Sequence, residues 1–185
     1  MKLTSETLSA RYDFRYLDLL VINGLKELAG SLGPNPTVIN LGAGFGTSAL
    51  TFMESRDDIR VITVDYHEET TEIGSLSCER ETMKEAGFLG DPRYEQIQGY
   101  SFDVGESWDR DRVDMVFVDA SHSYEACKAD ALAWIPHIID GGIIAFHDYW
   151  DRWNYGVIEA VDEVMEGFER IMLVSCLIAF RIKDS

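Results

Sequence analysis

The sequence predicts an α/β protein built on a doubly wound, mostly parallel seven-stranded sheet that ends in an antiparallel hairpin. Five short runs of apolar and β-branched residues have the composition of buried strands, and they occupy residues 37–42, 60–65, 94–99, 113–119 and 142–148. Stretches typical of helices separate these runs, as parallel crossovers require. Residues 169–184 hold two more apolar runs with almost nothing between them, and so short a connection permits only a hairpin.

Helices are predicted where apolar side chains recur three and four residues apart. The first such pattern covers residues 12–31 and stops near Gly33. The other helical stretches lie between the strands, at residues 46–55, 69–87, 123–139 and 156–167. Because the 185 residues contain no linker, repeat or low-complexity tract, we expect a single domain over 1–185, with a helical segment at 1–33 and a sheet core at 37–183.

Composition and charge limit the possible partners. The chain is 46% hydrophobic and 26% charged, and no apolar stretch approaches the roughly 20 residues that span a bilayer. Three scattered cysteines and an N-terminus without an apolar centre predict reduced thiols and a cytoplasmic location. A formal net charge of −17 repels phosphate backbones, so we expect neither a nucleic acid nor a membrane as partner.

A glycine-rich turn follows the first predicted strand. In "NLGAGFGTSAL", Gly42, Gly44 and Gly46 precede a helix, where glycines let a ligand approach the main chain closely. Thr47 stands where the dinucleotide fingerprint has its third glycine. Asp65 ends the second strand, where a carboxylate can accept hydrogen bonds from both hydroxyls of a ribose. Together these features indicate an adenosine-type cofactor; taken singly, a tight turn and an acidic helix cap also explain them.

Polar side chains also follow the later strands. Ser101 follows the third strand, where a loop could grip an adenine ring, and Asp119 ends the fourth strand with His122 three residues on. His147 and Asp148 end the fifth strand. The carboxyl ends of parallel strands meet at one edge of a sheet, so these groups should converge. Carboxylates suit Mg²⁺, histidine favours Mn²⁺, Fe²⁺ or Zn²⁺, and a histidine can also act as general base. The alternatives are that Asp119 is an ordinary strand-end residue, that His122 belongs to a helix cap and that His147 is a structural histidine.

The order of these segments resembles class I S-adenosylmethionine-dependent methyltransferases, which have a Rossmann-like fold. The resemblance rests on "NLGAGFGTS", "VITVD", "VDMVFVDASHSYEACKAD" and "IIDGGIIAFHDYW", and it covers about residues 37–183. The pattern D-x-x-H-S-Y-E-x-x-x-x-D followed by G-G-x-x-x-x-H-D is similar to the small metal-dependent O-methyltransferase branch, which includes sugar and antibiotic-tailoring enzymes. The resemblance implies S-adenosylmethionine as cofactor, a small-molecule hydroxyl as acceptor and a divalent metal, Mg²⁺ or Mn²⁺.

The resemblance also implies roles for individual residues. Asp119 and His122 would be catalytic, with His122 as the general base. The metal would be held by Asp119, His147 and Asp148. The cofactor would contact the glycine loop, the ribose ligand and the adenine wall, namely Asn40, Gly42, Gly44, Gly46, Asp65, Ser101 and Asp119. Two positions depart from the family pattern: Asn40 replaces an acidic residue, which should weaken contact with the cofactor's amino group, and His147 replaces a carboxylate, which should weaken Mg²⁺ binding.

The acceptor pocket is less sharply defined. Four aromatic residues beyond the fifth strand are expected to form a wall for a sugar or phenolic ring, a lid or a dimer contact: Tyr149, Trp150, Trp153 and Tyr155. Because the chain adds little to the core fold, we expect a homo-oligomer. The charge disfavours a nucleic-acid methyltransferase, and the glycine spacing disfavours an NAD-dependent oxidoreductase. The alternative from another class is a catalytically inactive S-adenosylmethionine-binding module with a regulatory or assembly role.

Overall fold

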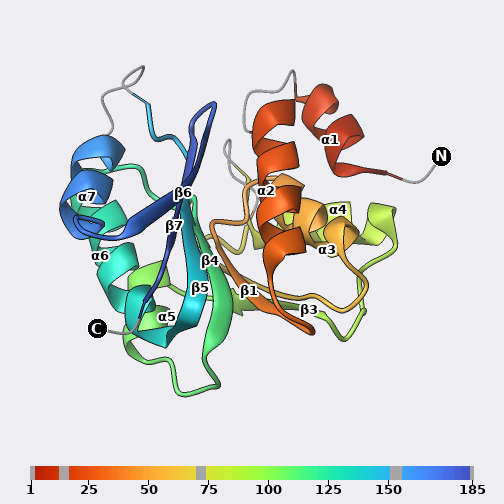
Figure 1. The fold of residues 1–185 in the computed structure, drawn as a ribbon. Helices are drawn as coiled ribbons and strands as arrows, with labels where there is room; N and C mark the ends of the chain where they lie inside the picture. Colours follow the sequence, from red (N-terminus) through yellow and green to blue (C-terminus); the bar gives the residue numbers. More distant parts are fainter. Residues whose placement is uncertain (1–2, 13–16, 70–73, 151–155, 184–185) are drawn as a thin grey trace.

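A seven-stranded sheet forms the centre of the protein. The computed structural model describes residues 3–12, 17–69, 74–150 and 156–183. Strands β1 to β5 pair in parallel, β7 is antiparallel to both β5 and β6, and the order is β3-β2-β1-β4-β5-β7-β6 (Figure 1). The bounds are Thr37–Leu41 for β1, Arg60–Asp65 for β2, Tyr94–Gln98 for β3, Val113–Val118 for β4, Ile138–Phe146 for β5, Glu169–Val174 for β6 and Leu177–Arg181 for β7. The predicted parallel sheet with a terminal hairpin is confirmed.

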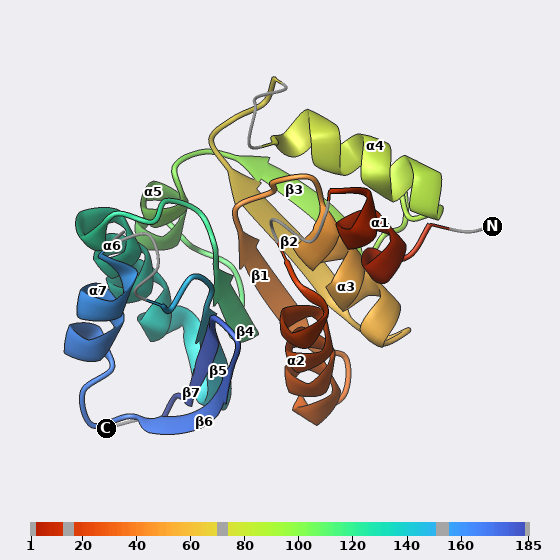
Figure 2. The same ribbon diagram turned by 90° about the horizontal axis from the view of Figure 1, so that it is seen from above.

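Helices cover both faces of the sheet. Helices α1 to α4 lie on one side and α5 to α7 on the other (Figures 1 and 2). Their bounds are Ser5–Arg11 for α1, Leu19–Ser31 for α2, Thr47–Ser55 for α3, Leu76–Ala86 for α4, Ser101–Glu106 for α5, Tyr124–Trp134 for α6 and Val157–Val164 for α7. Alternate residues of β4 serve the two cores: Met115 and Phe117 pack with α2 and α3, whereas Val116 and Val118 pack with α6 and α7. This double burial explains the near-continuous apolar strands.

The order of the strands reverses between β1 and β4. β1 pairs with β2 on one side and with β4 on the other, and the chain leaves β1 through α3 on one face of the sheet but leaves β4 through α6 on the other face (Figure 2). The ladders continue to this point, since Gly42 N donates to Val64 O at 2.9 Å and Asp119 N donates to Leu41 O at 3.0 Å. Ligands of doubly wound sheets bind at such a switch point. Within the described residues, no helix is long and apolar enough to cross a bilayer.

Several element boundaries differ from the prediction. Strand β5 begins at Ile138, four residues before the predicted start, and its register with β4 shifts between Val113 and Met115. Helix α4 begins after Ser75, whose side chain accepts a hydrogen bond from Cys78 N; residues 70–73 of the predicted stretch lie outside the described residues. Helix α6 ends at Trp134 and a 3₁₀ turn follows it. Helix α5 was not predicted as a helix.

The N-terminal segment contains two helices instead of the single helix predicted over residues 12–31. Tyr12 is the C-cap of α1, and Asp18 caps the start of α2 by accepting a hydrogen bond from Val21 N at 2.9 Å. Residues 13–16 lie outside the described residues. The Tyr12 ring stacks on Phe45 with their centroids 4.3 Å apart, so the end of α1 lies against the glycine loop. The prediction was wrong here because the apolar periodicity hid the capping signal of Asp18.

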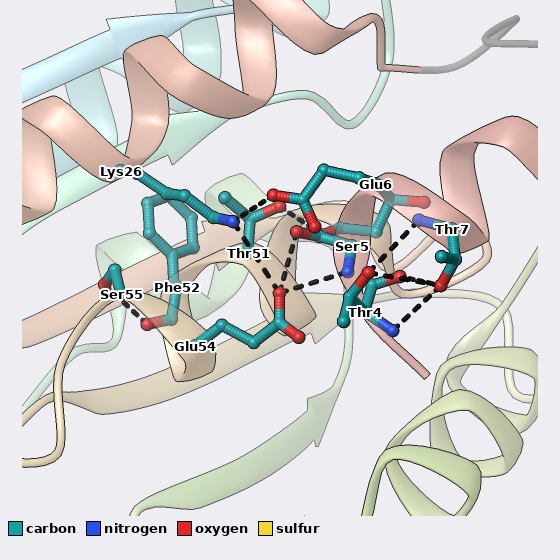
Figure 3. Close-up of polar contacts among 10 residues, drawn as sticks. Thr4, Ser5, Glu6, Thr7, Lys26, Thr51, Phe52, Glu54 and Ser55 are labelled. Atoms are coloured by element: carbon teal, nitrogen blue, oxygen red, sulfur yellow. Dashed lines mark hydrogen bonds and ion pairs between the residues drawn. The ribbon is translucent and has the colours of Figure 1, made fainter. Parts of the chain in front are cut away.

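Helix α1 is fixed to α3 by a buried polar contact, which Figure 3 shows. The backbone N–H and the hydroxyl of Ser5 both donate to Glu54 Oε2, at 3.0 and 2.8 Å, and Ser5 is fully buried. Lys26 Nζ lies 2.5 Å from Glu6 Oε1 and 3.8 Å from Glu54 Oε2, so α2 joins the same network. A charged acceptor that serves two buried donors makes this contact stronger than an ordinary surface ion pair.

Replacing Glu54 with alanine is expected to lower the free energy of unfolding by about 2 kcal/mol, because both Ser5 donors would remain buried without an acceptor. Urea denaturation followed by tryptophan fluorescence measures the change. Glu27→Ala on the exposed face of α2 is the control and should cost less than about 0.5 kcal/mol. Equal losses in the two variants would show that the contact does not hold α1.

Candidate active site

The glycine loop joins β1 to α3 in a conformation that excludes other residues. The φ angle is +95° at Gly42, +50° at Gly44 and +85° at Gly46. A Cβ atom on Gly42 would lie only 2.2 Å from the carbonyl oxygen of Asp119. Both the positive φ and this close approach require glycine at position 42. The loop after β1 is therefore in direct contact with the loop after β4.

Asn40 lies beneath this loop. Its side chain has no exposed surface, and its Nδ2 donates to the Gly42 carbonyl at 3.1 Å and to the Thr63 hydroxyl at 3.2 Å. The residue was predicted as a cofactor contact, and the structure places it where it shapes the loop from behind. A buried asparagine can do this because its amide group donates to two acceptors at once.

Asp65 stands at the end of β2 beside the glycine loop, as the prediction requires. Its Oδ2 accepts a hydrogen bond from Ala43 N at 2.8 Å, and its Oδ1 accepts one from His67 N at 2.7 Å. Each carboxylate oxygen can accept a further hydrogen bond, so the group keeps the capacity to bind ribose hydroxyls. The hydrogen bond from Ala43 also fixes the distance between this carboxylate and the loop.

Ser101 is the first residue of α5, and its side chain forms a hydrogen bond within the protein. Its hydroxyl donates to Asp130 Oδ1 at 2.5 Å, and its carbonyl accepts from Trp134 Nε1 at 3.0 Å. Burial raises the pKa of Asp130 to about 6, and the hydrogen bond from Ser101 only partly opposes this. The predicted adenine wall is thus held in place by two residues of α6 that the sequence did not single out.

Two tyrosines form an exposed aromatic surface next to Asp65. The Tyr66 and Tyr100 rings are stacked with centroids 4.2 Å apart and planes 10° apart, and each residue is about half exposed. They follow β2 and β3, whose carboxyl ends flank the predicted ribose site. Exposed aromatic faces suit a flat heterocycle such as adenine. No local pattern identified this pair, because it forms only when β2 and β3 are adjacent.

The four predicted catalytic and metal residues converge at the ends of β4 and β5. His122 Nε2 lies 3.5 Å from Asp119 Oδ1 and 3.3 Å from Asp148 Oδ2. His147 Nδ1 lies 3.1 and 3.4 Å from the same two oxygens. Asp148 has a φ of +54°, a conformation that aspartate adopts more readily than most residues and that places its carboxylate beside both histidines.

The environment of His147 includes a residue that the sequence did not predict. Cys176 lies between β6 and β7, and its Sγ is 3.3 Å from His147 Nε2. His147 and Cys176 are both buried, whereas His122 is about one third exposed. Both ring nitrogens of His147 therefore have polar neighbours inside the protein. Nothing in the local sequence marks Cys176, because only the terminal hairpin brings it to the end of β5.

The charges in this cluster shift one another's pKa values. Burial opposes the ionisation of Asp119, but His147 and His122 outweigh it and lower the pKa of this carboxyl group. Burial likewise opposes the charged form of both histidines, yet the Asp119 carboxylate raises the pKa of His122 and raises that of His147 well above the usual value. Asp119 and each of the two histidines thus favour each other's charged forms.

The donor atoms are spaced as ligands of one divalent cation would be. Asp119, His122 and Asp148 form one group of converging donors, and His147, Asp148 and Cys176 form another. Two ligands that each lie about 2.1 Å from an ion are about 3.0 Å apart in an octahedron and about 3.4 Å apart in a tetrahedron. The 3.1 to 3.5 Å separations between the histidine nitrogens and the carboxylate oxygens fit both geometries. The residues present fit a cation.

The predicted aromatic cluster does not gather in the residues that the structure describes. Tyr149 packs against the core under α6 and α7, and its hydroxyl donates to Asp162 Oδ1 at 2.7 Å. Trp150 packs against the core on the opposite face of the sheet. Trp153 and Tyr155 lie outside the described residues. A wall, a lid and a dimer contact therefore remain predictions.

The strand order, the terminal antiparallel hairpin and the site at the switch point define a class I S-adenosylmethionine-dependent methyltransferase. Residues 39–149, more than half of the chain, match the family model described as a methyltransferase domain, and the chain belongs to this family. No curated protein matches the sequence.

Solved structures show the same fold at low sequence identity. A candidate caffeoyl-CoA O-methyltransferase from Staphylococcus aureus is 16% identical over 96% of this chain and 90% of that chain, with a TM-score of 0.73. The O-methyltransferase TomG from Streptomyces achromogenes, involved in tomaymycin synthesis and solved with S-adenosylmethionine, is 16% identical over 97% of this chain and 88% of its own, with a TM-score of 0.72. A candidate rRNA methylase from Clostridium thermocellum is 13% identical over 86% and 95%, with a TM-score of 0.68.

Proposed function

We propose that this methyltransferase transfers the methyl group of S-adenosylmethionine to a hydroxyl of a small molecule, a sugar, a phenol or another natural product. The observation that carries the proposal is the convergence of Asp119, His122 and Asp148 at the switch point, beside the glycine loop. A hydroxyl acceptor must lose its proton, and a histidine flanked by two carboxylates can accept it. The net charge of −17 favours a small acceptor over a nucleic acid.

In this proposal the residues of the chain position the reactants and move one proton. The glycine loop and Asp65 hold the cofactor so that the acceptor oxygen can attack the methyl carbon in line with the departing sulfur, and S-adenosylmethionine supplies the methyl group. His122 is the most exposed of the four clustered residues and removes the acceptor proton, while its Nε2 faces Asp119 and Asp148. Asp119 and Asp148 orient its ring and stabilise the imidazolium that results.

The proposal includes a divalent cation held by Asp119, Asp148 and His147. When bound there, the cation would supply Lewis acidity that lowers the pKa of the acceptor hydroxyl. A histidine ligand favours Mn²⁺ or another transition metal over Mg²⁺. Calorimetric titration with MnCl₂ and with MgCl₂ tests this, and the absence of binding by either ion would remove the cation from the proposal.

A screen of acceptors with methyl-labelled S-adenosylmethionine tests the reaction itself. Sugars, phenols and rRNA are incubated with the protein, with and without Mn²⁺ or Mg²⁺, and the label is followed into the acceptor. We expect label in a small hydroxyl compound and none in rRNA. Cofactor binding without transfer to any acceptor would favour the inactive binding module. Transfer to rRNA would contradict the small-molecule acceptor.

Replacing His122 with alanine is expected to lower kcat about 10²- to 10⁴-fold, the range that a general base supplies. The limb of the pH–rate profile that reports the ionisation of this base should also disappear. The variant should still bind Mn²⁺, because the three proposed ligands remain. Steady-state kinetics with the acceptor from the screen and Mn²⁺ calorimetry measure the two properties. His67→Ala, at an exposed histidine after β2, is the control and should leave both unchanged. Loss of Mn²⁺ affinity in His122→Ala would make His122 a ligand and not the base.

A further inference from the structure

A buried carboxyl group lies behind the glycine loop, between the start of α4 and β3. Glu79 is the fourth residue of α4 and has no exposed surface. Its Oε1 accepts hydrogen bonds from the Tyr94 hydroxyl at 2.6 Å and from Gln96 Nε2 at 3.0 Å, both on β3. Fully buried glutamates are rare unless they are paired, yet this one has no cation on its carboxylate among the described residues. Such a residue calls for an explanation beyond packing.

Helix α4 is joined to the glycine loop at several points. A Cβ atom on Gly46 would lie 3.2 Å from both Cα and Cγ of Glu79, so the helix packs directly against the loop. The Thr82 hydroxyl donates to the Phe45 carbonyl at 2.8 Å, and Ser75 N donates to the Gly44 carbonyl at 2.9 Å. Any shift of the α4 start relative to the sheet must therefore move the loop.

Asn40 connects the same carboxyl group to the other end of the loop. Asn40 donates to the Gly42 carbonyl and to the Thr63 hydroxyl, and Thr63 in turn lies close enough to Glu79 to lower its pKa. Two buried oxygens of this cluster, Asn40 Oδ1 and Glu79 Oε2, have no hydrogen-bond partner among the described residues. Both are acceptors. A proton on Glu79 Oε2 would make this oxygen a donor and remove the buried charge.

We propose that Glu79 is a positioning residue for the cofactor and that its neutral, protonated form holds the glycine loop in the shape that binds. Ionisation of Glu79 leaves its charged Oε2 without a hydrogen-bond partner among the described residues and places a buried negative charge behind Gly46. The loop then loses the support that fixes its carbonyl groups, and cofactor affinity falls. This inference concerns the cofactor alone and stands or falls independently of the acceptor and the cation proposed above.

The charges around Glu79 agree with this assignment. Burial raises the pKa of Glu79 to about 7, although hydrogen bonds from Tyr94, Gln96 and Thr63 favour the ionised form. Asp65 on β2 adds a like charge that raises the pKa further. Arg80, the next residue of α4, is paired with Glu68 and donates to Gln96. The carboxyl group therefore changes its charge near neutral pH, with no direct ion pair to prevent this.

Calorimetric binding of S-adenosylhomocysteine at several pH values tests the proposal. This product lacks the sulfonium charge, so direct attraction to an ionised Glu79 is small. From about pH 6 to about pH 8.5 we expect the Kd of the wild-type protein to rise about fivefold, the effect of one buried hydrogen bond. In Glu79→Gln the amide is a permanent neutral donor, so the Kd should stay near the low-pH wild-type value. Glu81→Gln, at an exposed position of the same helix, should follow the wild type.

A second variant separates positioning from a merely structural role. Tyr94→Phe removes a donor that favours ionised Glu79, so the midpoint of the pH dependence should move to higher pH. A structural defect alone would weaken binding equally at every pH. The proposal is overturned if the wild-type Kd does not change with pH, or if Glu79→Gln keeps the wild-type pH dependence. If Glu79→Gln does not fold, an unshifted midpoint in Tyr94→Phe overturns it.

Discussion

Replacing Asp119 with asparagine is expected to lower kcat at least about a hundredfold while the protein still binds S-adenosylhomocysteine. The Asp119 carboxylate lies 3.1 Å from His147 and 3.5 Å from His122, and it favours the charged form of both rings. An asparagine amide has nearly the same shape but no charge, so the imidazolium formed by proton transfer loses its main stabilising partner. Steady-state kinetics with an identified acceptor and calorimetry with the product measure the two effects.

The matched control is Asp109→Asn, which removes the same charge from an exposed position before β4. It should leave kcat within about twofold of the wild-type value, because surface charges distant from the site are screened. Thermal denaturation of both variants separates a catalytic loss from unfolding. A folded Asp119→Asn enzyme with a normal kcat would remove Asp119 from the catalytic group.

Replacing Gly42 with alanine is expected to destabilise the protein by at least about 3 kcal/mol and to abolish cofactor binding. The new Cβ atom would overlap the Asp119 carbonyl oxygen at 2.2 Å, and the φ of +95° is strained for any residue with a side chain. Because that oxygen belongs to the backbone, relief would require the loops after β1 and β4 to separate. Urea denaturation and calorimetry with S-adenosylhomocysteine measure the two losses.

Gly30→Ala is the control for this substitution. Gly30 lies in the last turn of α2, and a Cβ atom there would meet nothing within 4 Å. Alanine is the better helix former, so this variant should be more stable than the wild type by up to about 1 kcal/mol. A Gly42→Ala protein as stable as Gly30→Ala would mean that the two loops are not packed as described.

The sheet and its hairpin were predictable because double burial leaves a strong signal in the sequence. Apolar β-branched runs marked the ends of most strands to within one residue. Helix α5 was missed because its six residues include Gly105 and are too few to show a period. The N-terminal helix was placed wrongly because the apolar spacing continued past Asp18, which caps α2.

The part of the candidate site that lies at the strand ends was predictable from the sequence. Asp119 and His147 follow adjacent parallel strands, so their convergence follows from the sheet. Cys176 and Asp130 come from a hairpin turn and a helix face, and no local pattern shows that they reach His147 and Ser101. The role of Asn40 was also hidden, because it depends on contacts with the Gly42 carbonyl and with Thr63 on the neighbouring strand.

The position of β7 has a consequence for the synthesis of the protein. β7 leaves the ribosome after β6, yet it inserts between β5 and β6 and completes the surroundings of His147 through Cys176. Until then β5 has an unpaired edge, which can recruit other chains. At usual translation rates the interval from Phe146 to Arg181 lasts roughly two to seven seconds. A nascent chain therefore stays exposed to misassociation along β5 until β7 has paired with it.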